Sequence, residues 1–293
     1  MRRAERAVSD PAIAILPYGH RQGRALADIP LSDLNWPLGR PERLGQGRLR
    51  DMGPRDHLIV YPKTTSHIDL RRGIRAQVSI MVVEPAIIHA RHLRLLRLTH
   101  RRFFRVLSFN RALLSRIPNG LFLPYGTTWV PDWRERVTDK SAMCSLIASA
   151  KRDSAGHQLR HRIVDHIRAT GRDVAVMGGG YAPFERKADG LAPYRYSVVI
   201  ENVREPDYFS EKLIDALLCL TVPIYWGCPN IHDYFDTAGM VICQNADEIE
   251  AALATMSELD YAARLPALKA ARPVADSFTD LERRAAETLC DSL

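Results

Sequence analysis

Apolar and polar positions alternate regularly in the second half of the chain. Residues 145–150 form a short apolar run, and a polar loop separates this run from a segment in which Leu159, Ile163 and Ile167 are spaced four residues apart. That spacing predicts a helix, and Gly171 directly after it suits the helix C-terminus. Strands that alternate with helices in this way predict a parallel sheet with helices on both faces.

The same patterns predict the other elements. In the second half we expect strands at residues 173–177, 196–200, 222–226 and 240–243, and helices at residues 211–220, 246–256 and 274–290. In the first half we expect strands at residues 12–16, 57–61, 77–83 and 103–107, a short helix at 111–116, and a strand that leads into a turn over 121–126. Prolines and glycines in the first fifty residues predict little regular structure there.

The length and composition favour two globular domains. The chain has 293 residues, of which 46% are hydrophobic and 26% charged, and this composition excludes an intrinsically disordered protein. Two domains of about 100–150 residues can each bury a core. We therefore predict an α/β protein with an N-terminal domain over residues 1–140, a C-terminal domain over 141–272 and a C-terminal helix over 273–293.

Charge is distributed unevenly between the two halves. Residues 1–150 contain 25 Lys and Arg against 12 Asp and Glu, whereas residues 151–293 contain 16 against 22. Between Arg71 and Arg116 there are eleven arginines and a single acidic residue, Glu84. Such asymmetry indicates domains with different partners. The basic half is compatible with an anionic membrane surface or a lipid-linked acceptor, and a solubilising surface is the simpler alternative.

Cysteine usage and the lack of a long apolar run favour the cytoplasm. The five cysteines are widely spaced and include no C-x-x-C pair, which argues against a disulfide scaffold and a structural zinc site. No apolar run approaches the roughly 18 residues of a membrane span, and no secretory signal follows the charged N-terminus. We therefore expect a cytoplasmic protein, with the inner face of the membrane as the place of any peripheral contact.

Ligands of a parallel sheet bind beyond the carboxyl ends of its strands. The predicted strand at residues 196–200 leads directly into Glu201 and Asn202, and the next helix opens with Glu211 and Lys212. A helix N-terminus attracts phosphate groups, and Lys212 adds a full positive charge there. The alternative is that both residues are ordinary solvent-exposed charges of a first helical turn.

A second candidate site follows the apolar run at residues 145–150. Arg160 lies one turn inside the helix there, and an arginine fork can bind phosphate oxygens with two hydrogen bonds. An exposed helix arginine is the alternative. The glycines at 178–180 lack the spacing of a dinucleotide fingerprint, so they indicate either close approach of a ligand or a tight turn. The sequence contains no D-x-D pair and no histidine spacing typical of metal ligands, so we expect no metal.

Residues 194–230 resemble the donor-binding signature of the α-1,3/1,4-fucosyltransferase family, glycosyltransferase family 10. The signature consists of a strand, Glu-Asn, a short loop, Tyr-x-Thr/Ser-Glu-Lys, a helix, and a strand with Val-Pro that ends in glycine. The matching segments are residues 194–202, 208–218 and 221–227, preceded by an arginine segment at 156–160. The match covers roughly residues 141–245 and is faint over 1–140. On it, the chain is identified as a divergent, soluble, bacterial-type member.

This resemblance implies a GT-B fold, in which two Rossmann-like domains face each other across a cleft and the C-terminal domain binds the donor. It also implies an inverting enzyme that transfers fucose from GDP-fucose to a hydroxyl of a glycan, such as a bacterial surface polysaccharide or lipopolysaccharide. No cofactor, metal or nucleic acid takes part in that reaction. Carried over to this chain, Arg160 and Lys212 neutralise the diphosphate, and Glu211 binds a hydroxyl of the ribose or the sugar.

The resemblance assigns further roles around the donor. Asn202 and Tyr208 would line the pocket, and Glu201 would brace the loop beside it. An inverting transfer also needs a carboxylate near the acceptor hydroxyl. Glu84 is the positional match for the family's glutamate, although it lacks the flanking Gly and Asn, and a surface glutamate at a strand end is the alternative.

Two other functions remain open from the sequence. The same fold can use another nucleotide sugar, because the matched motifs contact the diphosphate and ribose more than the sugar. A non-catalytic protein that binds nucleic acid or a membrane surface through the basic half is the second alternative.

Overall fold

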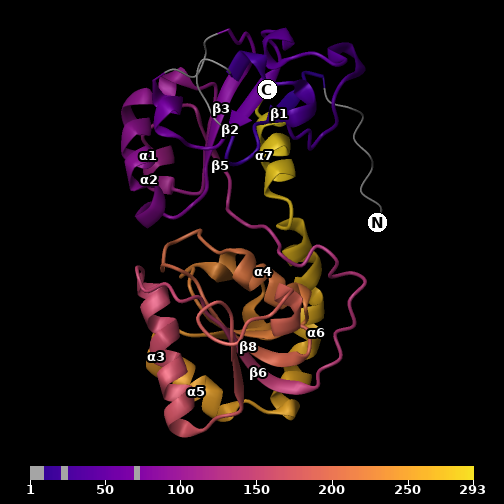
Figure 1. Cartoon of the computed structure of the whole chain (residues 1–293). Coiled ribbons are helices and arrows are strands. Elements are labelled where there is room, and N and C mark those ends of the chain that lie inside the picture. Colours follow the sequence, from indigo (N-terminus) through magenta and orange to yellow (C-terminus); the bar gives the residue numbers. More distant parts are fainter. Residues whose placement is uncertain (1–9, 21–25, 69–72) are drawn as a thin grey trace. The chain divides into compact units, whose positions relative to one another are not determined.

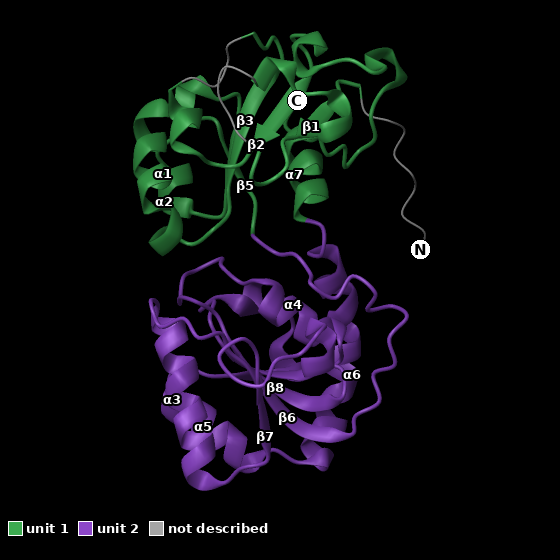
Figure 2. Ribbon diagram, in the orientation of Figure 1, with its two compact units in different colours: residues 1–124, 281–293 green, residues 125–280 purple. Residues whose placement is uncertain are grey.

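The computed structural model describes residues 10–20, 26–68 and 73–293, and the chain forms two compact units (Figures 1 and 2). Unit 1 comprises residues 1–124 and 281–293, and unit 2 comprises residues 125–280. These limits differ from the predicted ones at 140 and 272. Residues 125–140 belong to unit 2 because their side chains hydrogen-bond into it, as Thr128 does to Asp215.

Unit 1 contains a parallel sheet with the order β1-β2-β3-β4-β5. Its strands are β1 (Ile13–Ile15), β2 (His57–Val60), β3 (Gln77–Val82), β4 (Val106–Ser108) and β5 (Gly120–Phe122). Side chains of β1, β2 and β4 are fully buried, as a sheet covered on both faces requires. Helices α1 (Ala86–Thr99) and α2 (Arg111–Leu114) lie on one side of this sheet and α7 (Leu281–Cys290) on the other (Figure 2).

The described residues between β1 and β2 form short 3-10 turns, as the prolines and glycines of this segment predict. Helix α1 was not predicted, and the expected strand at 103–107 begins only at Val106, because residues 100–102 form a 3-10 turn. The physical reason for missing α1 is that it buries a single side chain, Leu96, so its sequence carries no clear apolar stripe.

Unit 2 contains a second parallel sheet with the order β10-β9-β8-β6-β7. Its strands are β6 (Ala142–Ile147), β7 (Val174–Met177), β8 (Tyr194–Ile200), β9 (Val222–Trp226) and β10 (Val241–Ile242). The first strand, β6, lies between β7 and β8, so the direction of winding reverses at β6. Such a reversal opens a crevice between the carboxyl ends of β6 and β8.

Helices cover both faces of this sheet, as predicted. Helices α3 (Ala155–Thr170) and α5 (Ala246–Thr255) lie on one face, and α4 (Glu211–Leu218) and α6 (Glu258–Ser277) on the other (Figure 2). Ser154 caps α3 by accepting a hydrogen bond from the His157 N–H, and Gly171 ends it with a left-handed φ of 63°. The C-terminus of α3 therefore agrees with the signal predicted from Gly171, whereas the Ser154 cap was not predicted.

The C-terminal region differs from the prediction of one helix from residue 273. Helix α6 continues through Pro266 and Pro273 to Ser277, and the chain then turns before α7 begins at Leu281. Helix α7 belongs to unit 1, where Glu282 accepts hydrogen bonds from Asn35 (2.7 Å) and Tyr61 (3.0 Å). Among the described residues, no helix combines the length and the apolar character that a membrane span needs.

Lys140 is a half-buried cation at the amino end of the unit 2 sheet. Its Nζ donates to the carbonyl oxygens of Ala192 (2.9 Å) and Cys219 (2.8 Å) and to Thr221 Oγ1 (3.0 Å). Cys219 is the C-cap of α4, where a positive charge is favourable. Burial nevertheless lowers the pKa of Lys140 to about 7.

We expect Lys140→Met to lower the free energy of unfolding by about 1–3 kcal/mol, because three buried acceptors lose their donor. Between about pH 7 and pH 10 the unfolded chain holds the Lys140 proton that the folded chain has released, so the native protein gains stability over the variant as the pH rises. Urea denaturation of both proteins across this range measures the difference. A constant difference would show that the ammonium group keeps its ordinary pKa.

Candidate functional site

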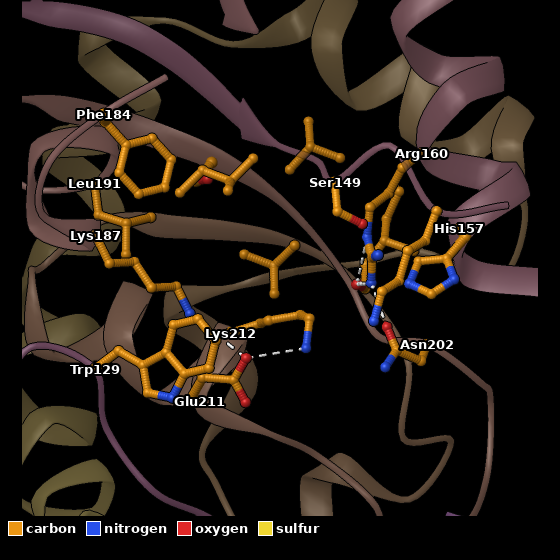
Figure 3. Close-up of a pocket in the computed structure, with 16 residues that line it drawn as sticks. Trp129, Ser149, His157, Arg160, Phe184, Lys187, Leu191, Asn202, Glu211 and Lys212 are labelled. Atoms are coloured by element: carbon orange, nitrogen blue, oxygen red, sulfur yellow. Dashed lines mark hydrogen bonds and ion pairs between the residues drawn. The ribbon is translucent and has the colours of Figure 1, made fainter. Parts of the chain in front are cut away.

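A cavity of about 280 Å³ lies where the winding of unit 2 reverses (Figure 3). Its walls come from the segment after β6, the first turns of α3, the end of β8, the first turn of α4 and the loop of residues 184–191. Its polar lining residues include Arg160, Lys187, Asn202, Glu211 and Lys212. The cavity therefore lies where the topology of a parallel sheet predicts a ligand site.

Helix α3 begins in direct contact with the chain that leaves β8. The Gly156 N–H donates to the Asn202 carbonyl at 3.0 Å. A Cβ atom on residue 156 would lie 1.7 Å from the Glu201 carbonyl oxygen, so only glycine fits at this position. This contact brings the positive N-terminal end of α3 to the edge of the cavity.

Arg160 lies one turn further along α3 and is only 5% exposed. Its guanidinium donates to the Ile200 carbonyl through Nε (3.0 Å) and Nη2, and Nη2 also donates to Asn202 Oδ1 (3.0 Å). Burial lowers the pKa of Arg160. Arg160 therefore holds the last residue of β8 and orients Asn202, while it also lines the cavity.

Glu201 stabilises the loop between β8 and α4. Its carboxylate is fully buried and accepts hydrogen bonds from the Ser210 N–H (2.8 Å) and Oγ (2.6 Å). Ser210 is in turn the N-cap of α4 and accepts from the Lys212 N–H. Glu201 is not among the residues that line the cavity, so the structure gives it contacts to the loop rather than to the cavity.

Glu211 and Lys212 form the first turn of α4. The Lys212 Nζ lies 3.1 Å from Glu211 Oε1, and the Nζ of Lys187 lies 3.7 Å from the same oxygen. Burial raises the pKa of Glu211, but the two ammonium groups outweigh it and lower this pKa to about 2. Figure 3 shows this charged group on one side of the cavity and Arg160, His157 and Asn202 on the other.

Lys187 was not predicted as a site residue. Its Nζ lies 3.0 Å from Asp215 Oδ2 and 4.8 Å from the centre of the Trp129 ring. Asp215 is fully buried and also accepts hydrogen bonds from Thr128 Oγ1 (2.6 Å) and the Trp129 N–H (3.2 Å). Lys187 therefore links two carboxylates of α4, Glu211 and Asp215. Lys187 opens a short 3-10 turn (Lys187–Gly190), and a lysine at such a position carries no sequence signal for this role.

The structure brings together Arg160, Asn202, Glu211 and Lys212, but the other candidates lie elsewhere. Tyr208 does not line the cavity: it is buried and stacks on Tyr125, with the ring centres 6.2 Å apart. Glu84 lies in unit 1, between the end of β3 and the start of α1. Placing these side chains requires knowledge of the tertiary packing.

The glycines at 178–180 make a turn of the chain. The Gly178 N–H donates to the Ala182 carbonyl, and a Cβ atom on Gly178 would lie 2.3 Å from the Ala148 carbonyl oxygen. Close approach is therefore needed here, to the backbone after β6. Within the described ranges, no cluster of three or more His, Cys, Asp or Glu could hold a metal ion.

Comparisons with curated proteins find fucosyltransferases. An α-(1,3)-fucosyltransferase of Helicobacter pylori is 35% identical over 57 residues, which are 20% of this chain and 12% of that protein. A 3-galactosyl-N-acetylglucosaminide 4-α-L-fucosyltransferase of Homo sapiens is 29% identical over 130 residues, 41% of this chain and 34% of the human protein. The matches thus span about a third or less of these relatives' own length. No family model matches the chain.

Solved structures of glycosyltransferases share the fold. An α1,3-fucosyltransferase with GDP superimposes with a TM-score of 0.50 at 16% identity and covers 72% of each chain. Anabaena HepE in complex with UDP gives a TM-score of 0.55 at 14% identity, over 80% of this chain and 79% of the other. An α-glucosyltransferase in complex with UDP-glucose and DNA gives 0.53 at 11% identity, over 83% and 81%.

These likenesses and the two five-stranded parallel sheets confirm the predicted α/β fold of GT-B type. The structural neighbours include several kinds of glycosyltransferase, whereas these curated relatives are named as fucosyltransferases. The resemblance found in the sequence is therefore confirmed, and the chain is a relative of the α-1,3/1,4-fucosyltransferases.

Proposed function

We propose that unit 2 binds the nucleoside diphosphate of a GDP-sugar, GDP-fucose, and that the protein transfers fucose to a hydroxyl group of a glycan with inversion. The observation that supports this is the position of Arg160 and Lys212 in one cavity, at the first turns of α3 and α4. Helix N-termini and fixed cations favour a bound diphosphate. Glu211, which stays ionised, can accept hydrogen bonds from hydroxyls of the ribose or the sugar.

In the proposed reaction the bond between the anomeric carbon and the phosphate oxygen breaks, and a bond to the acceptor oxygen forms on the opposite face. The acceptor hydroxyl gives its proton to a carboxylate base, for which Glu84 is our candidate. The departing GDP gains negative charge, which Lys212 and Arg160 stabilise. These cations take the place that a divalent metal holds in other transferases, so we propose a reaction that needs no metal or cofactor.

The proposal also names the nucleotide of the donor and the class of the acceptor. Curated relatives named as fucosyltransferases favour GDP-fucose. A UDP-sugar is the alternative, because two structural neighbours bind UDP or UDP-glucose on the same fold. On the acceptor side we propose a glycan, free or lipid-linked, that meets the enzyme in the cytoplasm, with no part for nucleic acid.

A thermal-shift panel in the presence of EDTA tests the donor. GDP and GDP-fucose should raise the melting temperature by much more than UDP, ADP or an RNA oligonucleotide does, because a ligand stabilises the fold that it binds. At about 100 times the Kd this stabilisation amounts to roughly 2.7 kcal/mol. Larger stabilisation by UDP would select the other nucleotide. Binding that appears only after Mn²⁺ or Mg²⁺ is added would contradict the metal-free proposal.

Lys212→Ala should weaken GDP binding about 10- to 100-fold, because it removes one charge-assisted contact worth about 1.5–3 kcal/mol. Isothermal titration calorimetry measures the affinity, and Lys269→Ala, an exposed lysine on α6, is the matched control. Arg160→Ala should lower both the affinity and the stability, since it also frees the Ile200 carbonyl and Asn202. Native affinity in Lys212→Ala would remove this residue from the site.

Lys187 is expected to keep Glu211 and Asp215 ionised. In Lys187→Met both buried carboxyl groups lose this cation. The pKa of Asp215, which burial already raises above its ordinary value, rises further, and the pKa of Glu211 rises from about 2 while Lys212 still lowers it. At Asp215 the folded variant then holds a proton that the unfolded chain releases, so its stability falls more steeply than that of the native protein as the pH rises above about 4. At neutral pH the loss should reach about 3–5 kcal/mol.

Urea denaturation across this pH range measures the effect of Lys187→Met. Lys187→Arg keeps the charge and should keep the native pH profile. A pH profile of Lys187→Met that parallels the native one would show that neither carboxyl group depends on Lys187.

A further inference from the structure

Helix α1 in unit 1 presents aliphatic side chains to solvent. Ile87, Ile88 and Leu98 are 56%, 54% and 84% exposed, whereas the helix buries only Leu96. In the described part of unit 1, few other large aliphatic side chains are this exposed. Exposed aliphatic groups that gather on one helix mark an interaction surface more often than single ones do.

Arginines occupy the same face of α1. Arg91, Arg94 and Leu98 follow each other at intervals of three and four residues, so they form one stripe along the regular part of the helix. Ile87 lies before the kink at His89, whose φ of −103° and ψ of 15° are not helical. Arg91, Arg94 and Arg97 are all exposed, and so is Arg101 in the turn that follows. No carboxylate among the described residues pairs with any of these four arginines.

The combination of exposed aliphatic groups and unpaired arginines fits one occupant. A helix that lies in a membrane interface places apolar side chains at the boundary of the acyl chains and basic side chains at the headgroups. Arginine binds phosphate oxygens through its planar fork, and its aliphatic stem can extend along the apolar boundary. A nucleic-acid backbone would satisfy the arginines but leave the aliphatic side chains in water.

We propose that the exposed face of α1, defined by Ile87, Arg91, Arg94 and Leu98, docks on an anionic membrane surface. At about 1.5 Å per residue the regular part of this helix after His89 is about 15 Å long, enough to lie along the headgroup layer. The contact holds unit 1 at the surface and does not involve the cavity of unit 2. It goes beyond the proposed function and does not depend on it.

Cosedimentation of the full chain with vesicles tests this proposal. Vesicles that contain phosphatidylglycerol should bind the protein at low salt, and high salt should weaken the binding because exposed charges are screened. Vesicles of phosphatidylcholine alone should bind it much less. Equal, negligible binding to both kinds of vesicle at low salt would overturn the proposal.

Two variants of α1 separate charge from apolar contact. Arg91→Gln/Arg94→Gln should weaken binding to anionic vesicles about 30-fold, equivalent to about 1 kcal/mol for each arginine. Leu98→Ser should weaken binding to anionic vesicles about tenfold, as expected when the burial of one leucine side chain is lost. All these side chains are exposed, so the melting temperature should stay near that of the native protein.

Matched controls lie outside α1. Leu259, on α6, is 82% exposed, so Leu259→Ser removes an equally exposed leucine and should bind like the native protein. Arg40→Gln/Arg55→Gln removes two charges from unit 1 outside this face and should retain most of the binding. If the control and α1 variants lose vesicle binding equally, the binding depends on net charge and not on the α1 face, and the proposal is overturned. Tight binding to an RNA duplex that survives Leu98→Ser would identify a nucleic acid as the occupant instead.

Discussion

The candidate site depends on the close contact between the first turn of α3 and the chain that leaves β8. This contact has no room for a side chain at residue 156, and it is held by the hydrogen bond from Gly156 to Asn202 and by the Arg160 guanidinium on the Ile200 carbonyl. The next residue, Glu201, then binds Ser210 and so sets where α4 begins. The N-termini of α3 and α4 thus reach the same cavity because residues 200–202 are held by α3 on one side and by the start of α4 on the other.

Charge balance is the second constraint on the cavity. Three carboxylates, those of Glu201, Glu211 and Asp215, are buried near it, and Lys187 and Lys212 lie among them. The carboxylates hold both lysines in position before any ligand arrives. They also offset much of the positive charge, so a bound diphosphate must share Lys212 with Glu211. In the proposed function, the affinity therefore rests on positioned donors and helix ends more than on net charge.

Much of unit 2 could be predicted from the sequence because helix α3 buries one face and the central strands are continuous apolar runs buried on both faces. Helix α3 has regularly spaced apolar residues, a serine cap and a terminal glycine, and the apolar runs of β8 and β9 lead directly to the motif residues. Helix α1 buries one side chain and α6 contains two prolines, so neither shows the pattern of an amphipathic helix. Lys187 and Trp129 come from irregular segments, and their roles follow from partners that only the tertiary structure brings near. Tyr208 matched a motif, but its ring packs on Tyr125 outside the cavity.

Unit 1 is assembled from two stretches of chain that lie on either side of unit 2 in the sequence. Helix α7 packs against β1, its Glu282 binds Asn35 and Tyr61, and Ser292 accepts hydrogen bonds from Arg105. During synthesis on the ribosome, unit 2 can fold as one continuous segment, whereas unit 1 lacks these contacts until α7 has emerged. Domains usually fold from the N-terminus onward. In this protein unit 2 can complete its fold before unit 1, although most of unit 1 precedes unit 2 in the sequence.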